Sequence, residues 1–404
     1  MAIEIRELGL DDVVDFLTPV TTAFGNAVDV ERAERLKTIP EFELRLAAFD
    51  EGSIVGAAGS FSFELTTPGG VVPTGGLTMV GVLPSHRRRG VLRSLMRRYL
   101  DGLRKAGRPV SALWASEAPI YGRFGYGMAS FQGETEIQRS HAAFALPVDP
   151  EGRVRLVDED EAAARFPAVW EQVRLETPGM LSRSTEWWRV RRVGDAEPEG
   201  LRGRGPLQRL LLEHDGAASG YALYRLQPNW EHGVPATTLH VVEAMATTPA
   251  AVGQVWRFLL DVDIVRHVAA WGLPVDHPLL LLAAEPRRLG FRLSDGLWVR
   301  LVDVGAALAE RTYGGTGAVV LDVIDSFCPW NEARWRLEGG GAERTRDDPD
   351  LRLDVGALGS AYLGGFTFAQ LARAGRVREL ADGAVRRADR LFYTGRAPWC
   401  PEIF

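Results

Sequence analysis

The residues best suited to chemistry are five consecutive ones, His86 to Gly90 (HRRRG), which separate an apolar run from an amphipathic one. Gly76–Leu83 has the length and composition of a strand, and from Val91 the apolar residues recur at helical spacing. A helix start leaves backbone N–H groups without intrahelical partners, at the positive end of the helix dipole. The three arginines add charge and forked donors, and Gly90 lets a ligand approach the backbone. The turn is therefore predicted to bind an anion, with a pyrophosphate as the expected guest.

Other phosphate-binding loops do not match this turn. The sequence has no G-x-x-x-x-G-K-[ST], and no G-x-G-x-x-G follows a predicted strand. A basic, solvated turn between a strand and a helix is the alternative, and an isolated R-R-R-G does not decide between the two. Neighbouring residues are needed for that decision.

A second segment with chemical potential follows a predicted strand at Pro109–Ser116. It reads EAPIYGRFGYG from Glu117 to Gly127, with glycines and aromatics at fixed offsets. Tyr121 is a candidate general acid, because a phenol with an ordinary pKa near 10 holds its proton at neutral pH. A packed aromatic with a satisfied hydroxyl is the alternative role for Tyr121, and Tyr126 is expected to be structural.

The arginine turn and the tyrosine segment together resemble the Eis (enhanced intracellular survival) family of GNAT-superfamily N-acetyltransferases. The turn resembles the acetyl-CoA pyrophosphate loop Q/R-x-x-G-x-G/A, with Arg87 first and Gly90 fourth. Leu92 stands where that pattern has Gly or Ala, but the Eis loop similarly reads HRRRG followed by a hydrophobic pair. The tyrosine segment with the preceding serine is nearly identical to the Eis pattern S-E-x-x-I-Y-G-R-F-G-Y-G.

The resemblance implies acetyl-CoA-dependent transfer of an acetyl group to a primary amine of an aminoglycoside, a polyamine or a lysine side chain, without a metal. It implies that Tyr121 protonates the departing thiolate and that the α-carboxylate of Phe404 accepts the proton of the amine. A carboxylate with an ordinary pKa near 3.5 is a weak base, so it would hold the ammonium, relay through water, or act with a pKa raised by burial. His86 is the alternative base, but its place inside the anion loop argues against that role. The positions that match the family's acetyl-CoA contacts are Val80, Gly81, Val82, Arg88, Arg89, Gly90, Val91, Leu92, Arg93, Ser116 and Glu117.

The expected acceptor pocket departs from that of aminoglycoside-acetylating Eis enzymes, which carry acidic residues there. Asn26 occupies the matching early position, and the acid near the end of the sequence is Glu402 rather than the residue before Phe404. Trp114 replaces a smaller polar ring. Fewer placed carboxylates weaken the binding of polycations, which puts antibiotic acetylation in doubt.

Composition restricts the class of protein. The 404 residues are 46% hydrophobic and 25% charged, as in a soluble globular protein of two or three domains. The 47 basic and 53 acidic side chains give a net charge of −6, which argues against general nucleic-acid binding. Cys328 and Cys400 cannot form a zinc site and are expected to be buried thiols. Neither a signal peptide nor a membrane span is apparent, so a cytoplasmic protein is expected.

The predicted elements and the resemblance give a mixed α/β fold with three domains. Residues 1–145 are expected to form a GNAT domain that binds acetyl-CoA and is catalytic, with a polar strand at Ser130–Gln138 near its end. Residues 146–295 are expected to form a degenerate second GNAT-like domain, for which a generic α/β domain is the alternative. Its turn at Ala246–Ala250 holds no cation and contains a proline, so it should not bind a pyrophosphate.

Residues 296–404 are expected to form a sterol-carrier-like α/β domain that supplies the terminal carboxylate. Leu297–Val302 is predicted as a strand of its sheet and Val377–Phe392 as its longest helix. Trp399, Ile403 and Phe404 would be costly to expose together, so the end of the chain is expected to be docked. A hydrophobic clamp between domains is the alternative role for this segment.

A non-catalytic acyl-CoA- or lipid-binding protein is the competing function, in which the third domain would matter most. The presence of both Tyr121 and an aromatic last residue argues against it. The family resemblance implies a homohexamer, and neither a membrane nor a nucleic acid is expected as a partner.

Overall fold

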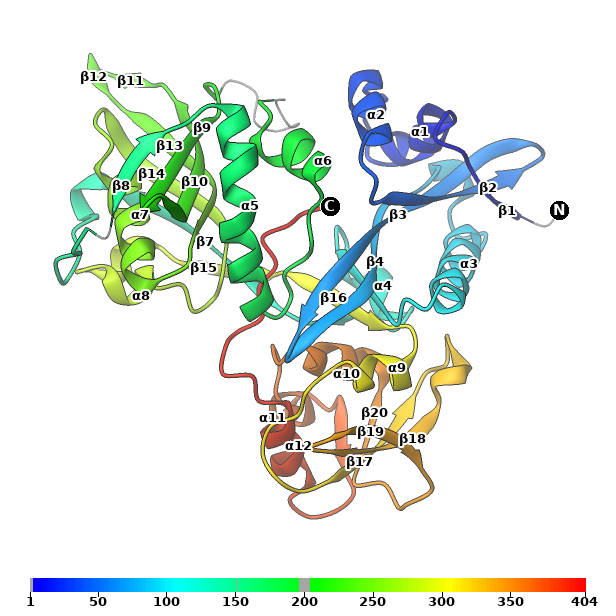
Figure 1. The fold of residues 1–404 in the computed structure, drawn as a ribbon. Coiled ribbons are helices and arrows are strands. Elements are labelled where there is room, and N and C mark those ends of the chain that lie inside the picture. The colour runs from blue at the N-terminus through cyan, green and yellow to red at the C-terminus, as the bar shows by residue number, and fades with distance from the viewer. Residues whose placement is uncertain (1–2, 151, 196–203) are drawn as a thin grey trace. The chain divides into compact units, whose positions relative to one another are not determined.

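In the computed structural model, which describes residues 3–150, 152–195 and 204–404, the chain forms two compact units of mixed α/β structure (Figure 1). The first unit comprises the residues up to Ser130 together with Gly296–Pro398 and Glu402–Phe404. The second comprises Phe131–Asp295 and Trp399–Pro401. No helix in the described part of the chain is both long and apolar enough to span a bilayer.

The first unit is built on a mixed sheet in which a late strand joins the early ones (Figure 1). β4 pairs with β5 in parallel, whereas β5 pairs with β16 antiparallel and β16 also pairs with β6. The strands in spatial order are β1 (Glu4–Glu7), β2 (Phe42–Asp50), β3 (Ser53–Thr67), β4 (Gly70–Val82), β5 (Val110–Trp114), β16 (Leu297–Leu301) and β6 (Gly127–Met128).

Two strands therefore lie in sheets other than those predicted from sequence. Leu297–Leu301 completes the first sheet instead of beginning a sterol-carrier-like sheet. The strand expected to close the first domain, observed as β7 (Phe131–Gln138), belongs to the sheet of the second unit. Each strand pairs with partners distant in sequence, and residue pattern alone does not specify which edge a strand joins.

Helices α1 (Val13–Ala23) and α3 (Val91–Lys105) cover opposite faces of the first sheet. Residues an odd number of positions apart in a strand, such as Gly56 and Gly59 of β3, face opposite sides of the sheet. A Cβ at Gly59 would lie 3.0 Å from Phe16 of α1, whereas a Cβ at Gly56 would lie 3.0 Å from Val91 of α3. The apolar face of α3, predicted from sequence, is buried in one core cluster that includes Leu95. α2 (Val30–Lys37) follows α1, and its first turn is capped by the Asp29 side chain.

The second unit repeats the arrangement of strand, helix and parallel strand. β13 (Thr237–Ala246) precedes α7 (Pro249–Asp261) and pairs in parallel with the strand that follows the helix. At the start of α7 the Thr248 hydroxyl accepts the Ala251 N–H at 3.0 Å, so one donor of this helix end is already used. The spatial order of the sheet is β15 (Arg292–Asp295), β7, β14 (Val265–Leu273), β13, β10 (Ala217–Gln227), β9 (Gln208–His214) and β8 (Arg153–Leu156).

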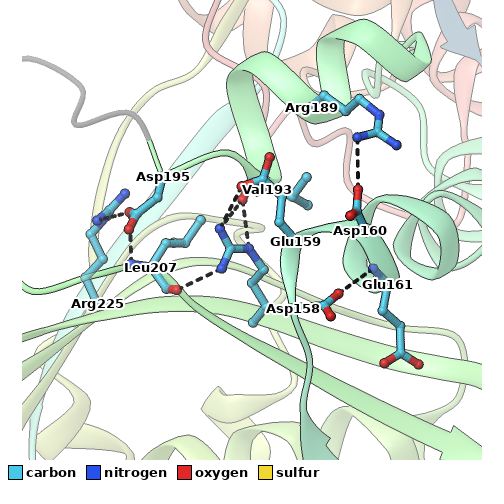
Figure 2. Close-up of polar contacts among 10 residues, drawn as sticks. Asp158, Glu159, Asp160, Glu161, Arg189, Val193, Asp195, Leu207 and Arg225 are labelled. Carbon is cyan, nitrogen blue, oxygen red and sulfur yellow. Dashed lines mark hydrogen bonds and ion pairs between the residues drawn. The ribbon is translucent and has the colours of Figure 1, made fainter.

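Helix α5 (Glu159–Glu176) of the second unit begins in a cluster of acidic residues that cap the helix and form ion pairs (Figure 2). The Asp158 side chain accepts the Glu161 N–H at 2.8 Å and caps the helix. Arg189 pairs with Asp160 at 3.2 Å on the same turn. The acidic residues at this end of α5 are therefore explained by the capping of the helix and by the ion pair with Arg189.

The remaining part of the first unit is a smaller sheet with short helices (Figure 1). The helix predicted over Val377–Phe392 is instead a short strand and a shorter helix, separated by Gly383 in the left-handed region (φ 76°). Cys328 and Cys400 are buried free thiols, as predicted. The strands in order are β19 (Gly341–Thr345), β18 (Ala333–Glu338), β17 (Val319–Ile324), β20 (Leu351–Asp354) and β21 (Val377–Glu379), and the helices are α9 (Val304–Ala309), α10 (Val355–Tyr362), α11 (Phe368–Arg373) and α12 (Ala384–Phe392).

Candidate active site

The arginine turn connects β4 to α3 through a short 3₁₀ turn, Pro84–His86. Arg88 and Gly90 both have positive φ, 61° and 83°, so the backbone twice enters the left-handed region within three residues. This conformation is costly for Arg88, and such costs are typical of functional turns. A Cβ at Gly90 would meet nothing within 4 Å, so glycine is needed there for its positive φ and not for space.

The start of α3 is open to a ligand. Its first intrahelical hydrogen bond runs from the Ser94 N–H to the Gly90 carbonyl at 3.0 Å. Helix geometry leaves the N–H groups of Val91, Leu92 and Arg93 without intrahelical acceptors, at the end of the helix where the dipole favours an anion. The turn therefore has the geometry of an anion site.

Strand β4 loses its neighbour on one side before it reaches the turn. In the described chain its parallel pairing with β5 ends at Gly76, opposite Ala112. On the other side a bulge at Met79 and Val80 interrupts pairing with β3, and Met79 has a positive φ of 49°. The last residues of β4 can therefore form main-chain hydrogen bonds with an extended ligand placed like an added strand.

The open edge of β4, the arginine turn and the tyrosine segment line one cavity of about 740 Å³. This volume is in the range of small-molecule sites. The predicted residues that line it are Val80, Gly81, Val82, Arg88, Gly90, Val91, Leu92, Arg93, Ser116, Glu117 and Tyr121. Arg89 is not among the lining residues: its guanidinium pairs with Asp50 at 2.8 Å, and His86 Nε2 lies 3.3 Å from the same carboxylate.

Several lining residues were not assigned as acetyl-CoA contacts from sequence. They are Ala23 and Phe24 at the end of α1, His86 and Arg87 in the turn, and Ile120, Arg123 and Phe124 in the tyrosine segment. All but the first two lie inside the motifs already singled out, so a wider reading of those motifs would have found them. Phe24 is 57% exposed although it is aromatic, but this exposure is seen only in the structure, and the sequence around Phe24 gave no signal of it.

Tyr121 lies in the short helix α4 (Ala118–Gly122) and is 7% exposed. Burial, with a smaller contribution from the charge of Glu117, raises the pKa of Tyr121 to about 12. Its ring contacts that of Tyr126 edge-on, with centroids 6.0 Å apart. Tyr126 donates to or accepts from Ser111 at 2.7 Å and is fully packed, which supports a structural role.

The glycines of the tyrosine segment allow close packing against residues after Gly296. A Cβ at Gly125 would lie 2.9 Å from the guanidinium carbon of Arg300, and one at Gly127 would lie 1.9 Å from the Gly356 carbonyl oxygen. Gly125 also has φ 84°. The backbone that positions Tyr121 is therefore supported directly by strand β16 and helix α10.

Gly127→Ala is expected to lower the free energy of unfolding by about 3 kcal/mol, because its Cβ would overlap a backbone oxygen that cannot rotate away. Gly122→Ala in the same segment is the matched control, since a Cβ there meets nothing within 4 Å, and it should change that free energy by less than about 0.5 kcal/mol. Chemical denaturation of both variants measures the difference. Equal stability of the two variants would contradict this account of the packing.

The last residue of the sequence lies in the first unit. The Phe404 ring contacts that of Phe63 with centroids 5.2 Å apart, and its Cε2 would lie 3.0 Å from a Cβ at Gly76. Gly76 is the residue at which β4 and β5 part. Trp114, at the end of β5, donates its indole N–H to the Glu402 carbonyl at 2.7 Å. Of the residues expected to be docked, Trp399 is 8% exposed and the Phe404 ring packs on Phe63, whereas Ile403 is 43% exposed, so the expectation was wrong for Ile403.

The residues expected near the amine acceptor include few solvent-exposed carboxylates. Asn26 is exposed, and the Glu402 side chain is fully buried. Glu117 is the one acidic residue among the described residues that line the cavity, where Arg87, Arg88, Arg93 and Arg123 supply positive charge. The charge of the cavity favours an anionic ligand over a polycation.

Family models match three parts of the chain. Residues 4–129 and residues 179–301 each match an acetyltransferase (GNAT) domain, and residues 304–401 match a sterol carrier protein domain. The tandem GNAT folds and the following sterol-carrier-like domain predicted from sequence are thus confirmed.

Relatives match this chain over nearly its whole length. The chain is 42% identical to an "uncharacterized N-acetyltransferase" of Streptomyces avermitilis over 100% of both sequences. It is 33% identical to N-acetyltransferase Eis of Mycobacterium tuberculosis, over 95% of this chain and 94% of that protein. The crystal structure of Eis1 from Mycobacterium abscessus superposes with a TM-score of 0.86 at 35% identity, covering 99% of this chain and 100% of the other. The chain is therefore a GNAT-type N-acetyltransferase that belongs to the Eis family.

Proposed function

We propose that this enzyme transfers the acetyl group of acetyl-CoA to a primary amine by direct attack, with Tyr121 as general acid and the α-carboxylate of Phe404 as proton acceptor. The observation that carries the proposal is the single cavity that joins the buried Tyr121 phenol to the arginine turn and to the open edge of β4. A thioester whose phosphates bind at the turn and whose arm follows β4 would bring its acyl group toward Tyr121.

Binding is assigned to the main chain and to the arginines. Val80, Gly81 and Val82 would pair with the pantetheine arm, and the N–H groups at the start of α3 with Arg88 and Arg93 would hold the pyrophosphate. Ser116 and Glu117 would form the far wall. Arg89 would act indirectly, since its pairing with Asp50 fixes the turn.

The chemistry balances with these groups. The amine nitrogen forms a bond to the acyl carbon, the carbon–sulfur bond breaks, Tyr121 gives its proton to the sulfur, and the Phe404 carboxylate takes the proton of the amine. Tyr121 then regains a proton from solvent. A thiol pKa near 8.5 lies below that of Tyr121, so transfer is favourable only if the same burial raises the pKa of the thiol as well.

The position of Phe404 supports its proposed role. Its ring is held at the point where β4 and β5 separate, on the sheet face that packs against α1. A carboxylate fixed there would hold an approaching ammonium and relay its proton, without having to be a strong base.

Incubation with labelled acetyl-CoA and a panel of lysine peptides, polyamines and aminoglycosides tests the proposal. We expect kcat/KM for a lysine peptide to exceed that for an aminoglycoside by about tenfold, because Asn26 is uncharged and the Glu402 side chain is fully buried, which leaves few carboxylates to bind a polycation. Product masses and initial rates give the comparison. Binding of acetyl-CoA without acetylation of any amine would instead favour a non-catalytic acyl-CoA-binding role.

A further inference from the structure

One side chain of the sterol-carrier-like domain packs against residues that line the cavity, although it does not line the cavity itself. Phe327 follows β17 and is 3% exposed. Its ring contacts that of Phe124, which lines the cavity, with centroids 5.1 Å apart and planes at 71°. It is part of the same core cluster as Val91 and Leu95 of α3. One side chain of the third domain thus packs against both the tyrosine segment and the helix that follows the arginine turn.

Two arginines of α3 lie over the Phe327 ring. The guanidinium carbon of Arg97 is 4.2 Å from the ring centroid, and that of Arg93 is 5.2 Å away. Both distances are within the range of cation–π attraction. Arg93 also lines the cavity and is exposed, whereas Arg97, one turn further on, is half-buried.

The segment that carries Phe327 is held firmly. Asp325 pairs with Arg300 at 2.6 Å, and both side chains are almost completely buried. The Asp325 carboxylate also accepts the Cys328 N–H at 2.9 Å and the Asn331 side-chain amide at 2.8 Å. The buried Asp325 carboxylate therefore holds the backbone on both sides of Phe327 through these hydrogen bonds, which gives Phe327 a fixed position.

We propose that Phe327 is a positioning residue for acetyl-CoA: it holds Arg93 against the phosphate-bearing end of the cosubstrate. This inference rests on the proposed cosubstrate site. A free arginine side chain loses rotamer freedom when it binds a phosphate, and an aromatic face that already restricts Arg93 reduces that loss. The sterol-carrier-like domain then acts in acetyl-CoA binding without itself requiring a lipid.

Phe327→Leu tests the proposal, because it keeps an apolar side chain and removes the aromatic face. We expect the Kd for CoA, measured by calorimetry, and the KM for acetyl-CoA to rise about threefold to tenfold, with kcat within about twofold of wild type. The KM for S-acetylpantetheine, which lacks the pyrophosphate and the whole nucleotide, should not change. Phe327→Trp should restore CoA affinity, since its ring is a stronger cation–π partner.

Phe392→Leu is the matched control. Phe392 is also 3% exposed, lies in the same domain and stacks on an arginine, Arg311, at 4.1 Å, but neither residue lines the cavity. The control should lose stability and keep its CoA affinity. If both phenylalanine variants weaken CoA binding equally, or if neither does, the proposal is wrong.

A double-mutant cycle with Arg93→Gln identifies the partner of Phe327. If Phe327 acts through Arg93, Phe327→Leu adds no further loss of CoA affinity in the Arg93→Gln background. Full additivity, or coupling to Arg97→Gln alone, would overturn the assignment. Because CoA binding is measured without turnover, this outcome is independent of whether any amine is acetylated, and failure of the proposed reaction would appear only in the rates.

Discussion

Replacement of Tyr121 by phenylalanine is expected to lower kcat by about 10² to 10⁴-fold, while the KM for acetyl-CoA changes by less than about threefold. The substitution removes only the hydroxyl and leaves the ring packed against Tyr126. The thiolate then departs without a proton donor. Steady-state rates at saturating amine measure the effect.

The pH dependence follows from the direction of the Tyr121 pKa shift. Burial raises that pKa to about 12, so the phenol is protonated throughout the usual assay range. Activity should therefore rise with pH as the amine loses its proton, with no decline from Tyr121 ionisation below about pH 11. The free energy of unfolding should change in the opposite direction. The pKa of Tyr121 is about 10 in the unfolded chain and about 12 in the folded one, so the contribution of the neutral phenol to stability is complete below pH 10 and is lost as the pH rises to about 12.

Tyr126→Phe is the control for this prediction. It removes the hydroxyl that contacts Ser111 at 2.7 Å and is expected to cost about 1 kcal/mol of stability while kcat stays within about threefold of wild type. A Tyr121→Phe enzyme with near-normal kcat, or a Tyr126→Phe enzyme with the larger loss, would remove Tyr121 from the proposed role.

Extension of the chain by three residues after Phe404 is expected to lower kcat by at least about 100-fold without changing the Kd for CoA. The ring of Phe404 rests on Phe63 and over Gly76, so its main chain has a defined position, and extension converts its carboxylate into an uncharged peptide group. The cosubstrate cavity contains no residue of this terminal segment and should be unaffected. Rates and calorimetry on the same preparation separate the two quantities.

Phe404→Leu provides the comparison for the extended chain. It keeps the carboxylate and weakens only the ring contact with Phe63, so its loss of kcat should be much smaller. Proteolytic removal of the added residues should restore the rate. Full activity in the extended protein would show that the amine loses its proton to another group.

The residues that line the cavity were easier to predict from sequence than the strand pairing. The turn at His86–Gly90 and the segment around Tyr121 are each continuous in sequence, and local patterns predict the strand before each of them and the helix that starts at Val91. The structure brings eleven of the predicted site residues together around one cavity. Arg89 does not line the cavity, because its guanidinium forms an ion pair with Asp50. Asp50 belongs to β2, and no local pattern linked it to the turn.

Long-range contacts were not predictable in this way. β16 and β7 have ordinary strand patterns, but their partners depend on which sheet edge is open after the whole chain has folded. Phe327, Arg300 and Gly356 support the site from more than 170 residues away, and nothing in their local sequence indicates it. The bounds predicted for the three domains, at residues 145 and 295, stay a prediction.

The place of β16 in the first sheet has a consequence for biosynthesis. While a ribosome is still translating the residues before Leu297, β5 has no antiparallel neighbour and β6 has no recorded partner among the described strands. The nascent first acetyltransferase domain would expose an unpaired strand edge until β16 has been synthesised, a state prone to association with other chains. Expression of the first 130 residues alone would make that transient state permanent.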